Sequence, residues 1–513
     1  MRRLFDKYPA CTVLVLMLVC FSPLMALRDF TPANELRYLS IADEAIREGH
    51  LFAFTNHGLP YADKPPLYLW LFMLCRLIFG GHVMYVLSMF SFIPMAVIVL
   101  TMDRWVYGDG GGNSGKRAAS ALMLGTSMLF MGISMFLRMD MLMTMFIVLA
   151  LYSWHKDRPW LFALFTFLAL FTKGPVGMLA PPLALITYFA VSRSKGLGRW
   201  LGWRFWLLTA GLCAIWFTGA YLEGGKEYLG NLLFHQTIDR AVNSFNHKEP
   251  FFFYFLGIWE VLFPWCLLAI PLLIISLIKH QNSTPTETML RCTALSAFVM
   301  LSCFSSKINL YLAPIIPFTI YLVPLAAGRL GWRRWMSWAI AVPAALTGLL
   351  GLILLLVSLL PLLDGISSIQ PYLCFFHSPW MAAVGGVLAA GGILTAIKTF
   401  PDKSVEGTVP LASSIVAAVL LFSPIVPGLN HFIGYAALCK DIPAGEKVYG
   451  RKVQRCENMD VFLGHEITKL PDDAPTPADG VFVSKASVDD PVLDGRRKIV
   501  HGENAVWLPR GWE

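Results

Sequence analysis

Residues 140–192 read DMLMTMFIVLALYSWHKDRPWLFALFTFLALFTKGPVGMLAPPLALITYFAVS. Three apolar runs, 140–155, 159–172 and 175–192, are separated only by the short polar links 156–158 and 173–174. A membrane-spanning helix needs about 20 predominantly apolar residues, and a few fewer where it packs against other helices. The stretch therefore predicts consecutive membrane-spanning helices joined by tight turns.

The composition of the whole chain agrees with this prediction. The 513 residues are 56% hydrophobic, 14% charged and 13% aromatic, and the mean hydropathy is +0.60. Soluble proteins carry about 25% charged and roughly 45–50% apolar residues. The sequence thus excludes a soluble cytosolic enzyme, a disordered chain and a nucleic-acid-binding module, and it predicts an all-α polytopic membrane protein surrounded by membrane lipids. The predicted spans, about 13 in number, are 9–26, 83–102, 117–137, 140–155, 159–172, 175–192, 205–222, 254–278, 292–305, 309–327, 336–362, 379–398 and 409–427.

The basic residues set the orientation of these spans. Of the 41 Lys and Arg residues, 19 lie in alternate loops in phase with the N-terminus, 11 lie in the opposite loops and 11 lie in the C-terminal tail. Because cytoplasmic loops are enriched in Lys and Arg, the loops that hold 19 of them are predicted to be cytoplasmic. The segments predicted to face outward are 27–82, 223–253, 306–308, 363–378 and the tail from about 428.

Two apolar segments need a separate interpretation. Residues 66–79 (PLYLWLFMLCRLIF) are apolar, but counting them as a span would invert every later loop. They are therefore predicted to form an amphipathic helix in the outer interface. The first run follows Arg2, Arg3 and Lys7 in the manner of a signal peptide, but its poor cleavage site and the many spans after it favour an uncleaved helix.

The C-terminal tail, residues 430–513, differs from the rest of the chain. It is polar, with short apolar runs such as GVFVS and AVWLP between Pro, Asp and Gly clusters, which predicts a small domain of α/β or mostly β type on the outer face. Cys439 and Cys456 either form a disulfide, if the tail lies in an oxidising compartment, or remain free thiols. The Gly-rich residues 108–115 are interpreted as a connector, and no nucleotide cofactor is expected because no nucleotide-binding motif is visible.

Charged residues from different segments converge at the outward boundary. Charges within or beside the membrane core are costly, so each one is a candidate functional residue. In the first loop they lie in the motifs 34–38 (NELRY) and 61–66 (YADKPP); further along they include Asp140, Lys173, Lys307 and residues 235–248. The order of the spans places all of them at one water–lipid boundary, which predicts a site there.

These motifs resemble those of the GT-C glycosyltransferases, and most closely the superfamily of dolichyl-phosphate-mannose protein mannosyltransferases and bacterial aminoarabinose transferases. The two first-loop motifs are followed by 138–140 (RMD), 172–174 (TKG), 247–251 (HKEPF), 262–265 (LFPW) and 305–314 (SSKINLYLAP), in the order of the aminoarabinose transferases. The resemblance covers about residues 10–320. It implies a transferase domain over residues 1–429, with periplasmic loops at 27–82 and 223–253, and a periplasmic domain over 430–513, in the inner membrane of a bacterium.

The resemblance implies a donor in which a polyprenyl phosphate carries the sugar. Such a donor needs cations for its phosphate and an apolar groove for its chain. The motif positions that match this role are Lys64, Lys173, Arg37, Tyr38 and Tyr311. Alternatively, Arg37 pairs with Glu35 and Lys64 with Asp63, or the lysines are interfacial anchors.

Transfer of the sugar needs a base near the acceptor hydroxyl, and Glu35 and Asp140 are the candidates. The family places an Asp immediately before the residue that matches Glu35. This sequence has Asn34 there, whose amide can orient a hydroxyl but cannot accept its proton. Either Glu35 or Asp140 takes the role, or the acceptor chemistry differs. Asp140 is alternatively a residue favoured at a helix start by the helix dipole.

The resemblance also implies a divalent metal, zinc, shared by the acidic residue of the acidic-Lys-Pro motif and a histidine of the second outward loop. The matching positions are Asp63 and His247. Two ligands make a weak site, and His247 is equally well a simple loop histidine. The second loop, which ends in Phe251, Phe252 and Phe253, is predicted to order over the groove when donor binds or to anchor itself in the interface.

Three functions are consistent with these patterns. The first is an integral-membrane glycosyltransferase that uses a polyprenyl-phosphate sugar; the resemblance favours 4-amino-4-deoxy-L-arabinose and lipid A, and another sugar with a protein or glycan acceptor is the alternative. The second is a transporter or flippase of a lipid-linked anion. Two observations argue against it: the charged groups lie at one face, and no repeat is visible. The third is a membrane scaffold, which leaves the charged cluster unexplained.

Overall fold

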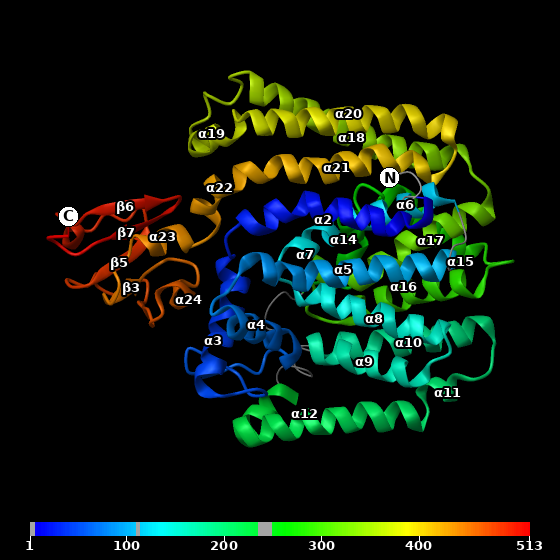
Figure 1. The fold of residues 1–513 in the computed structure, drawn as a ribbon, viewed down its shortest axis with the longest axis horizontal. Coiled ribbons are helices and arrows are strands. Elements are labelled where there is room, and N and C mark those ends of the chain that lie inside the picture. The colour runs from blue at the N-terminus through cyan, green and yellow to red at the C-terminus, as the bar shows by residue number, and fades with distance from the viewer. Residues whose placement is uncertain (1–5, 109–112, 234–248, 513) are drawn as a thin grey trace.

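The protein is a long helical bundle that carries a small domain of strands at one end (Figure 1). The computed structural model describes residues 6–108, 113–233 and 249–512. The helices of the bundle are α2 (Pro9–Leu27), α5 (Met84–Tyr107), α6 (Ser114–Gly125), α7 (Met128–Met135), α8 (Met139–His155), α9 (Pro159–Lys173), α10 (Pro175–Ser192), α11 (Leu197–Leu201), α12 (Trp203–Gly230), α14 (Phe253–Val261), α15 (Cys266–Ile278), α16 (Pro285–Cys303), α17 (Ile316–Leu330), α18 (Arg334–Leu359), α20 (Pro379–Asp402), α21 (Val409–Phe422) and α22 (Val426–Ile433).

The helices have the lengths and compositions of membrane spans. Among the described residues, eight helical segments are long and apolar enough to cross a bilayer, and the bent pair α6 and α7 makes a ninth. Shorter apolar helices, among them α8, α9 and α15, complete the bundle. Each of the predicted span ranges falls on a helix. The prediction of a multi-pass, mostly helical membrane protein is confirmed.

Two of the predicted ranges, 117–137 and 254–278, are broken where the sequence predicts one continuous span. Helices α6 and α7 meet at an angle of 71°, and α14 and α15 are separated by a turn with a cis Phe263–Pro264 bond. Helix α12 is kinked at Gly225, just past its predicted range. The two breaks contact each other. The Met128 N–H donates to the Phe263 carbonyl (2.9 Å), and the Trp265 Nε1–H donates to the Thr126 hydroxyl (3.2 Å). Each break thus satisfies polar groups that the other exposes.

Three helices from the segments predicted to face outward gather at one end of the bundle, together with the C-terminal domain. Helices α3 (Arg37–Glu48), α4 (Pro66–Phe79) and α19 (Leu373–Phe376) all lie there, and the N-terminal end of α2 lies at the opposite end (Figure 1). Helix α4 is shorter than the helices that qualify as spans. It buries Tyr68, Leu69 and Phe72 and exposes Leu77 and Ile78.

The C-terminal domain is built on a five-stranded mixed sheet. Its strands are β3 (Val448–Gly450), β4 (Thr468–Lys469), β5 (Val481–Lys485), β6 (Lys498–His501) and β7 (Asn504–Trp507). The order is β4-β3-β5-β7-β6; β3 runs parallel to β4 and β5, and β7 runs antiparallel to β5 and β6. The predicted small α/β domain is thus present. Cys439 and Cys456 are free, buried thiols, so the disulfide alternative does not hold.

The first outward loop is tied to its neighbours on two sides. Its residues share one apolar core with the C-terminal domain; Leu36, Leu39 and Phe72 belong to the same cluster as Val448 and Val481. On the other side, the Glu223 carboxylate on α12 accepts the backbone N–H groups of residues 51–53 at 2.6–2.9 Å. The loop is therefore a packed part of the outward end.

Candidate active site

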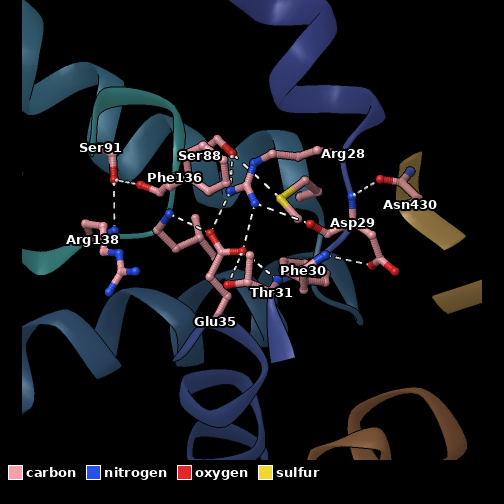
Figure 2. Close-up of polar contacts among 12 residues, drawn as sticks. Arg28, Asp29, Phe30, Thr31, Glu35, Ser88, Ser91, Phe136, Arg138 and Asn430 are labelled. Carbon is pink, nitrogen blue, oxygen red and sulfur yellow. Dashed lines mark hydrogen bonds and ion pairs between the residues drawn. The ribbon is translucent and has the colours of Figure 1, made fainter. Parts of the chain in front are cut away.

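The first motif of the outward loop forms a π-helical turn, η1 (Pro32–Leu36), directly before α3. Its Glu35 side chain is 1% exposed and forms a two-pronged ion pair with Arg28, with both N–O distances 2.8 Å. The carboxylate also accepts the N–H and hydroxyl of Thr31 (2.8 and 3.1 Å) and the Leu137 N–H (2.8 Å). Figure 2 shows these groups converging on Glu35. All of its lone-pair directions are thereby engaged in holding the structure.

This geometry decides whether Glu35 pairs with Arg37, a question that the sequence leaves open. Glu35 pairs with Arg28, and no ion pair joins it to Arg37 among the described residues. Arg28 is absent from the predicted site because it stands at the end of an apolar run and has the position of an interfacial anchor. Only the folded chain shows that it is buried, with 7% of its surface exposed.

The same network reaches the link between α7 and α8. The Ser91 hydroxyl donates to the Phe136 carbonyl (2.7 Å) and accepts the Arg138 N–H (3.4 Å), as Figure 2 shows. Two residues further on, Asp140 lies in the first turn of α8, 2% exposed. The turn of the first loop and the start of α8 are thus held in register by shared hydrogen bonds.

Asp140 forms an ion pair with Lys173, the last residue of α9. Gly174 follows with φ 92° and ψ −147°, a conformation open mainly to glycine, and Pro175 starts α10. The Lys173 Nζ lies 4.4 Å from the centre of the Tyr311 ring. Tyr311 belongs to the 3-10 turn η3 (Asn309–Ile315) that precedes α17. Three predicted residues from three elements therefore meet at one place.

A cavity of about 220 Å³ opens beside this group. Its polar lining includes Asp63, Lys64, Lys173 and Tyr311, so the structure brings together the second motif of the first loop, the α9–α10 turn and η3. Most of its other lining side chains are apolar: Met143, Leu170, Val176, Trp216, Phe217, Leu232, Leu233 and Phe304. A cation-bearing pocket with apolar walls has the features expected for a ligand with a charged head and a hydrocarbon chain.

Arg37 and Tyr38 lie beside this cavity but do not line it. The Tyr38 ring is buried against Phe72 and Tyr68, with centroids 6.0 and 6.2 Å away, and burial raises the pKa of its phenol. The Arg37 guanidinium lies 5.7 Å from the ring centres of both Tyr38 and Tyr61. Burial opposes its charge, but Tyr61, Tyr38 and Asp63 together raise the pKa of Arg37. Its Nε is buried without a hydrogen-bond partner.

Asn34 lies in η1, where its backbone carbonyl accepts the Arg37 N–H. Of the two predicted metal ligands, Asp63 lines the cavity and His247 lies outside the described residues. Within the described part of the chain, no three His, Cys, Asp or Glu side chains come together as a metal site. Of the two predicted zinc ligands, the described residues thus include only Asp63. The metal stays a prediction, and no chemical step is assigned to it.

Comparisons with known proteins agree with this architecture. No family model matches the chain. An uncharacterized protein of Aquifex aeolicus is 24% identical over 293 residues, 55% of this chain and 57% of that protein. The undecaprenyl phosphate-alpha-4-amino-4-deoxy-L-arabinose arabinosyl transferase of Shewanella sediminis is 23% identical over 318 residues, 58% of this chain and 56% of that protein. The matched part therefore spans little more than half of these relatives.

The solved structures extend the likeness to the whole chain. The crystal structure of ArnT from Cupriavidus metallidurans bound to undecaprenyl phosphate superposes with a TM-score of 0.73 at 17% identity, covering 97% of both chains. The apo structure of the same protein gives a TM-score of 0.72 with the same coverage. The chain thus has the fold of these ArnT structures, which confirms the predicted resemblance at the level of the fold.

Proposed function

We propose that this chain is an integral-membrane glycosyltransferase that moves a sugar from a polyprenyl phosphate to an acceptor at the outer face of a bacterial inner membrane. The observation that carries the proposal is the cavity in which Lys64, Lys173 and Tyr311 meet a wall of apolar side chains. A phosphate head and a prenyl chain are the two halves of such a donor, and the cavity offers a complement to each.

The lysines would act on the leaving group. As the bond between the sugar and the phosphate breaks, negative charge grows on the phosphate oxygens. Fixed cations that face this charge in a water-poor pocket stabilise the transition state more than the ground state. Lys173 is half-buried and Lys64 lines the same cavity, so both meet this requirement. Arg37, beside Asp63, adds a further positive charge at the edge of the site.

The base of the reaction is assigned to Asp140. Glu35 is engaged by Arg28, Thr31 and Leu137 and has no oxygen to spare for an acceptor. Among the described residues, Asp140 has one ion-pair partner, Lys173, and that partner faces the cavity. A carboxylate held this way can receive the proton of an acceptor group that enters beside the donor. Asn34 then has an orienting role at most.

The relatives and the resemblance support one donor and one acceptor as the first pair to test. The Shewanella sediminis protein is named for transfer of 4-amino-4-deoxy-L-arabinose from undecaprenyl phosphate, and the Cupriavidus metallidurans structure holds undecaprenyl phosphate. We therefore take undecaprenyl-phosphate aminoarabinose as the donor to test first. Lipid A is the acceptor that the aminoarabinose-transferase resemblance favours.

The test is transfer of radiolabelled sugar from this donor to lipid A by the purified protein. Wild type is compared with Asp140→Asn and with Asp103→Asn as the matched control. Asp103 is also 2% exposed and ion-paired, with Arg117, but lies in the last turns of α5, away from the outward end. We expect Asp140→Asn to lower kcat by about 10²–10⁴, the range for loss of a general base, and Asp103→Asn to retain activity.

Each other outcome has a defined meaning. Equal activity in wild type and Asp140→Asn would keep the reaction class and reject Asp140 as the base. No transfer to lipid A, with transfer to another envelope acceptor, would reject only the acceptor. Passage of the labelled lipid across a vesicle membrane without any transfer would overturn the glycosyltransferase proposal in favour of a flippase.

A further inference from the structure

A short segment of the C-terminal domain, Cys456–Leu463, lies against the first outward loop. Its Asn458 is 1% exposed. The Asn458 Nδ2–H donates to the Pro32 carbonyl (3.0 Å), at the first residue of η1. The other side of the same carboxamide, Oδ1, lies 3.2 Å from His57 Nε2. One buried side chain of the domain therefore fixes the start of the turn that precedes Arg37.

The next contact of this segment lies on the other side of Arg37. The Ser40 hydroxyl donates to Asp460 Oδ2 (2.7 Å), and Asp460 is held in place by the Val461 N–H (2.8 Å). The ring of Phe462 packs against Phe30, with centroids 6.4 Å apart. The C-terminal domain thus holds the first loop both before and after Arg37.

Among the described residues, the Arg37 guanidinium is held mainly by the side chain that follows it, Tyr38, through a hydrogen bond. The guanidinium is also placed by ring contacts with Tyr38 and Tyr61 and by the charge of Asp63, and its Nε is unpaired. The Arg37 backbone N–H bonds to Asn34, inside the turn that Asn458 fixes. The direction of the guanidinium therefore depends on how η1 and the first turn of α3 are held.

We infer that the C-terminal domain is a positioning part of the donor site: Asn458 and Asp460 clamp the loop on either side of Arg37 and so aim its guanidinium at the donor phosphate. This inference rests on the proposed function, and it assigns a role to a domain that carries no residue of the cavity. Asn458 and Asp460 are positioning residues, because they act through the backbone at Pro32 and the side chain of Ser40.

The test uses two variants that approach the clamp from opposite sides. Asn458→Asp keeps the shape of the side chain and its contact with His57 but replaces the N–H donor that faces Pro32 with an oxygen. Ser40→Ala removes the hydrogen bond to Asp460 without changing the C-terminal domain. The control is Ser484→Ala in β5, since the Ser484 hydroxyl is buried and has no hydrogen-bond partner.

We expect Asn458→Asp to raise KM for the polyprenyl-phosphate sugar about tenfold, and Ser40→Ala to raise it about threefold, the scale of one lost hydrogen bond. The acceptor KM should change little, and the melting temperature should fall less in Ser40→Ala than in Asn458→Asp, which buries a new carboxylate. Amide exchange over residues 31–40 should be faster in both variants. Ser484→Ala should leave all these values as in wild type.

Two results would overturn the inference. One is an unchanged donor KM with faster exchange in residues 31–40, which would make the clamp purely structural. The other is a loss of melting temperature that accounts for the whole loss of activity in both variants. A direct measurement of undecaprenyl phosphate binding separates failure of this inference from failure of the proposed function. If wild type does not bind the lipid and Lys64→Ala does not change the binding signal, the proposed function fails, whatever the clamp variants show.

Discussion

Glu35 shows how one buried carboxylate joins three segments of the outward end. It binds Arg28 from the end of α2, Thr31 from the first loop and Leu137 from the link before α8. Burying two charges is costly, and the cost is offset only when geometry and additional hydrogen bonds are good. Both conditions are met here, so the pair serves the placement of the neighbouring candidate-site residues more than it serves chemistry.

Removal of both partners of this pair should cost clearly less than the sum of the two single removals. Glu35→Gln leaves Arg28 buried without a counter-charge, and we expect the free energy of unfolding to fall by about 3–5 kcal/mol. Arg28→Met should cost a similar amount. The double variant Arg28→Met/Glu35→Gln should cost clearly less than the sum, because the uncompensated charge is gone. Melting temperatures in one detergent test this, and strict additivity would show that the two charges do not depend on each other.

The residues of the site differ in how far the sequence could predict them. Asp140, Lys173, Lys64 and Tyr311 could be placed on one side of the membrane from the order of the spans, and the structure brings them together. Arg28 and Glu223 could not, because the role of Arg28 depends on its burial beside the Glu35 carboxylate and that of Glu223 on backbone groups far away in the chain. Glu223 binds residues 51–53, about 170 positions earlier. No local pattern records such a partner.

At the scale of elements, the turn between α9 and α10 fixes Lys173. Gly174 adopts φ 92°, and an L-residue there would be strained by about 1–3 kcal/mol. We expect Gly174→Ala to weaken binding of undecaprenyl phosphate at least tenfold, because relief of the strain moves Lys173. The matched control is Gly132→Ala in α7, where the added methyl meets no atom within 4 Å. Equal binding by the two variants, measured by titration, would contradict this role of the turn.

The C-terminal domain should lose stability in acid through one carboxylate. Hydrogen bonds from Thr476 and from the Val492 N–H, with help from Arg451, hold the pKa of Asp490 below its ordinary value. A carboxyl with a lowered pKa in the folded state stabilises the fold above the unfolded pKa, and this contribution disappears as the pH falls through the folded pKa. Between about pH 5 and 3, protection of residues 476–492 against amide exchange should fall in wild type, after correction for intrinsic rates.

In Asp490→Asn the same protection should be lower at pH 5 and should change less across the range. Ser484→Ala, in the same domain, serves as the control and should follow wild type. Parallel pH profiles for wild type and Asp490→Asn would show that other groups control the acid response.

Element boundaries show where sequence patterns stop being informative. Apolar length predicts that a segment is a buried helix, and each predicted range is helical. It does not predict the breaks at α6–α7 and α14–α15, because the links 126–127 and 262–265 are too short to divide an apolar run of span length. The breaks are stabilised by contacts between each other, such as Trp265 with Thr126. That information exists only once the two segments are packed.

At the scale of the whole molecule, the first loop and the C-terminal domain lie at the same end of the bundle. The orientation of the protein in the membrane can therefore be tested at its two termini. If the basic loops face the cytoplasm, a tag after Glu513 should be removed by protease added to intact spheroplasts, and a tag before Met1 should be protected. Both tags should be cut after lysis. Cleavage of the N-terminal tag alone would reverse the proposed orientation and place the cavity on the cytoplasmic side.

The apolar core shared by the first loop and the C-terminal domain also has a consequence for biosynthesis. Pro32 and Asn458 are 426 positions apart, so at about 5–20 residues per second the ribosome makes the second partner roughly 20–90 s after the first. Until then Leu36, Leu39 and Phe72 lack the neighbours that Val448 and Val481 supply. In the proposed orientation, this end of the molecule reaches its native form only after the last strands have crossed the membrane. A prematurely terminated chain therefore presents an open apolar surface outside the bilayer, where chaperones and proteases of that compartment meet it.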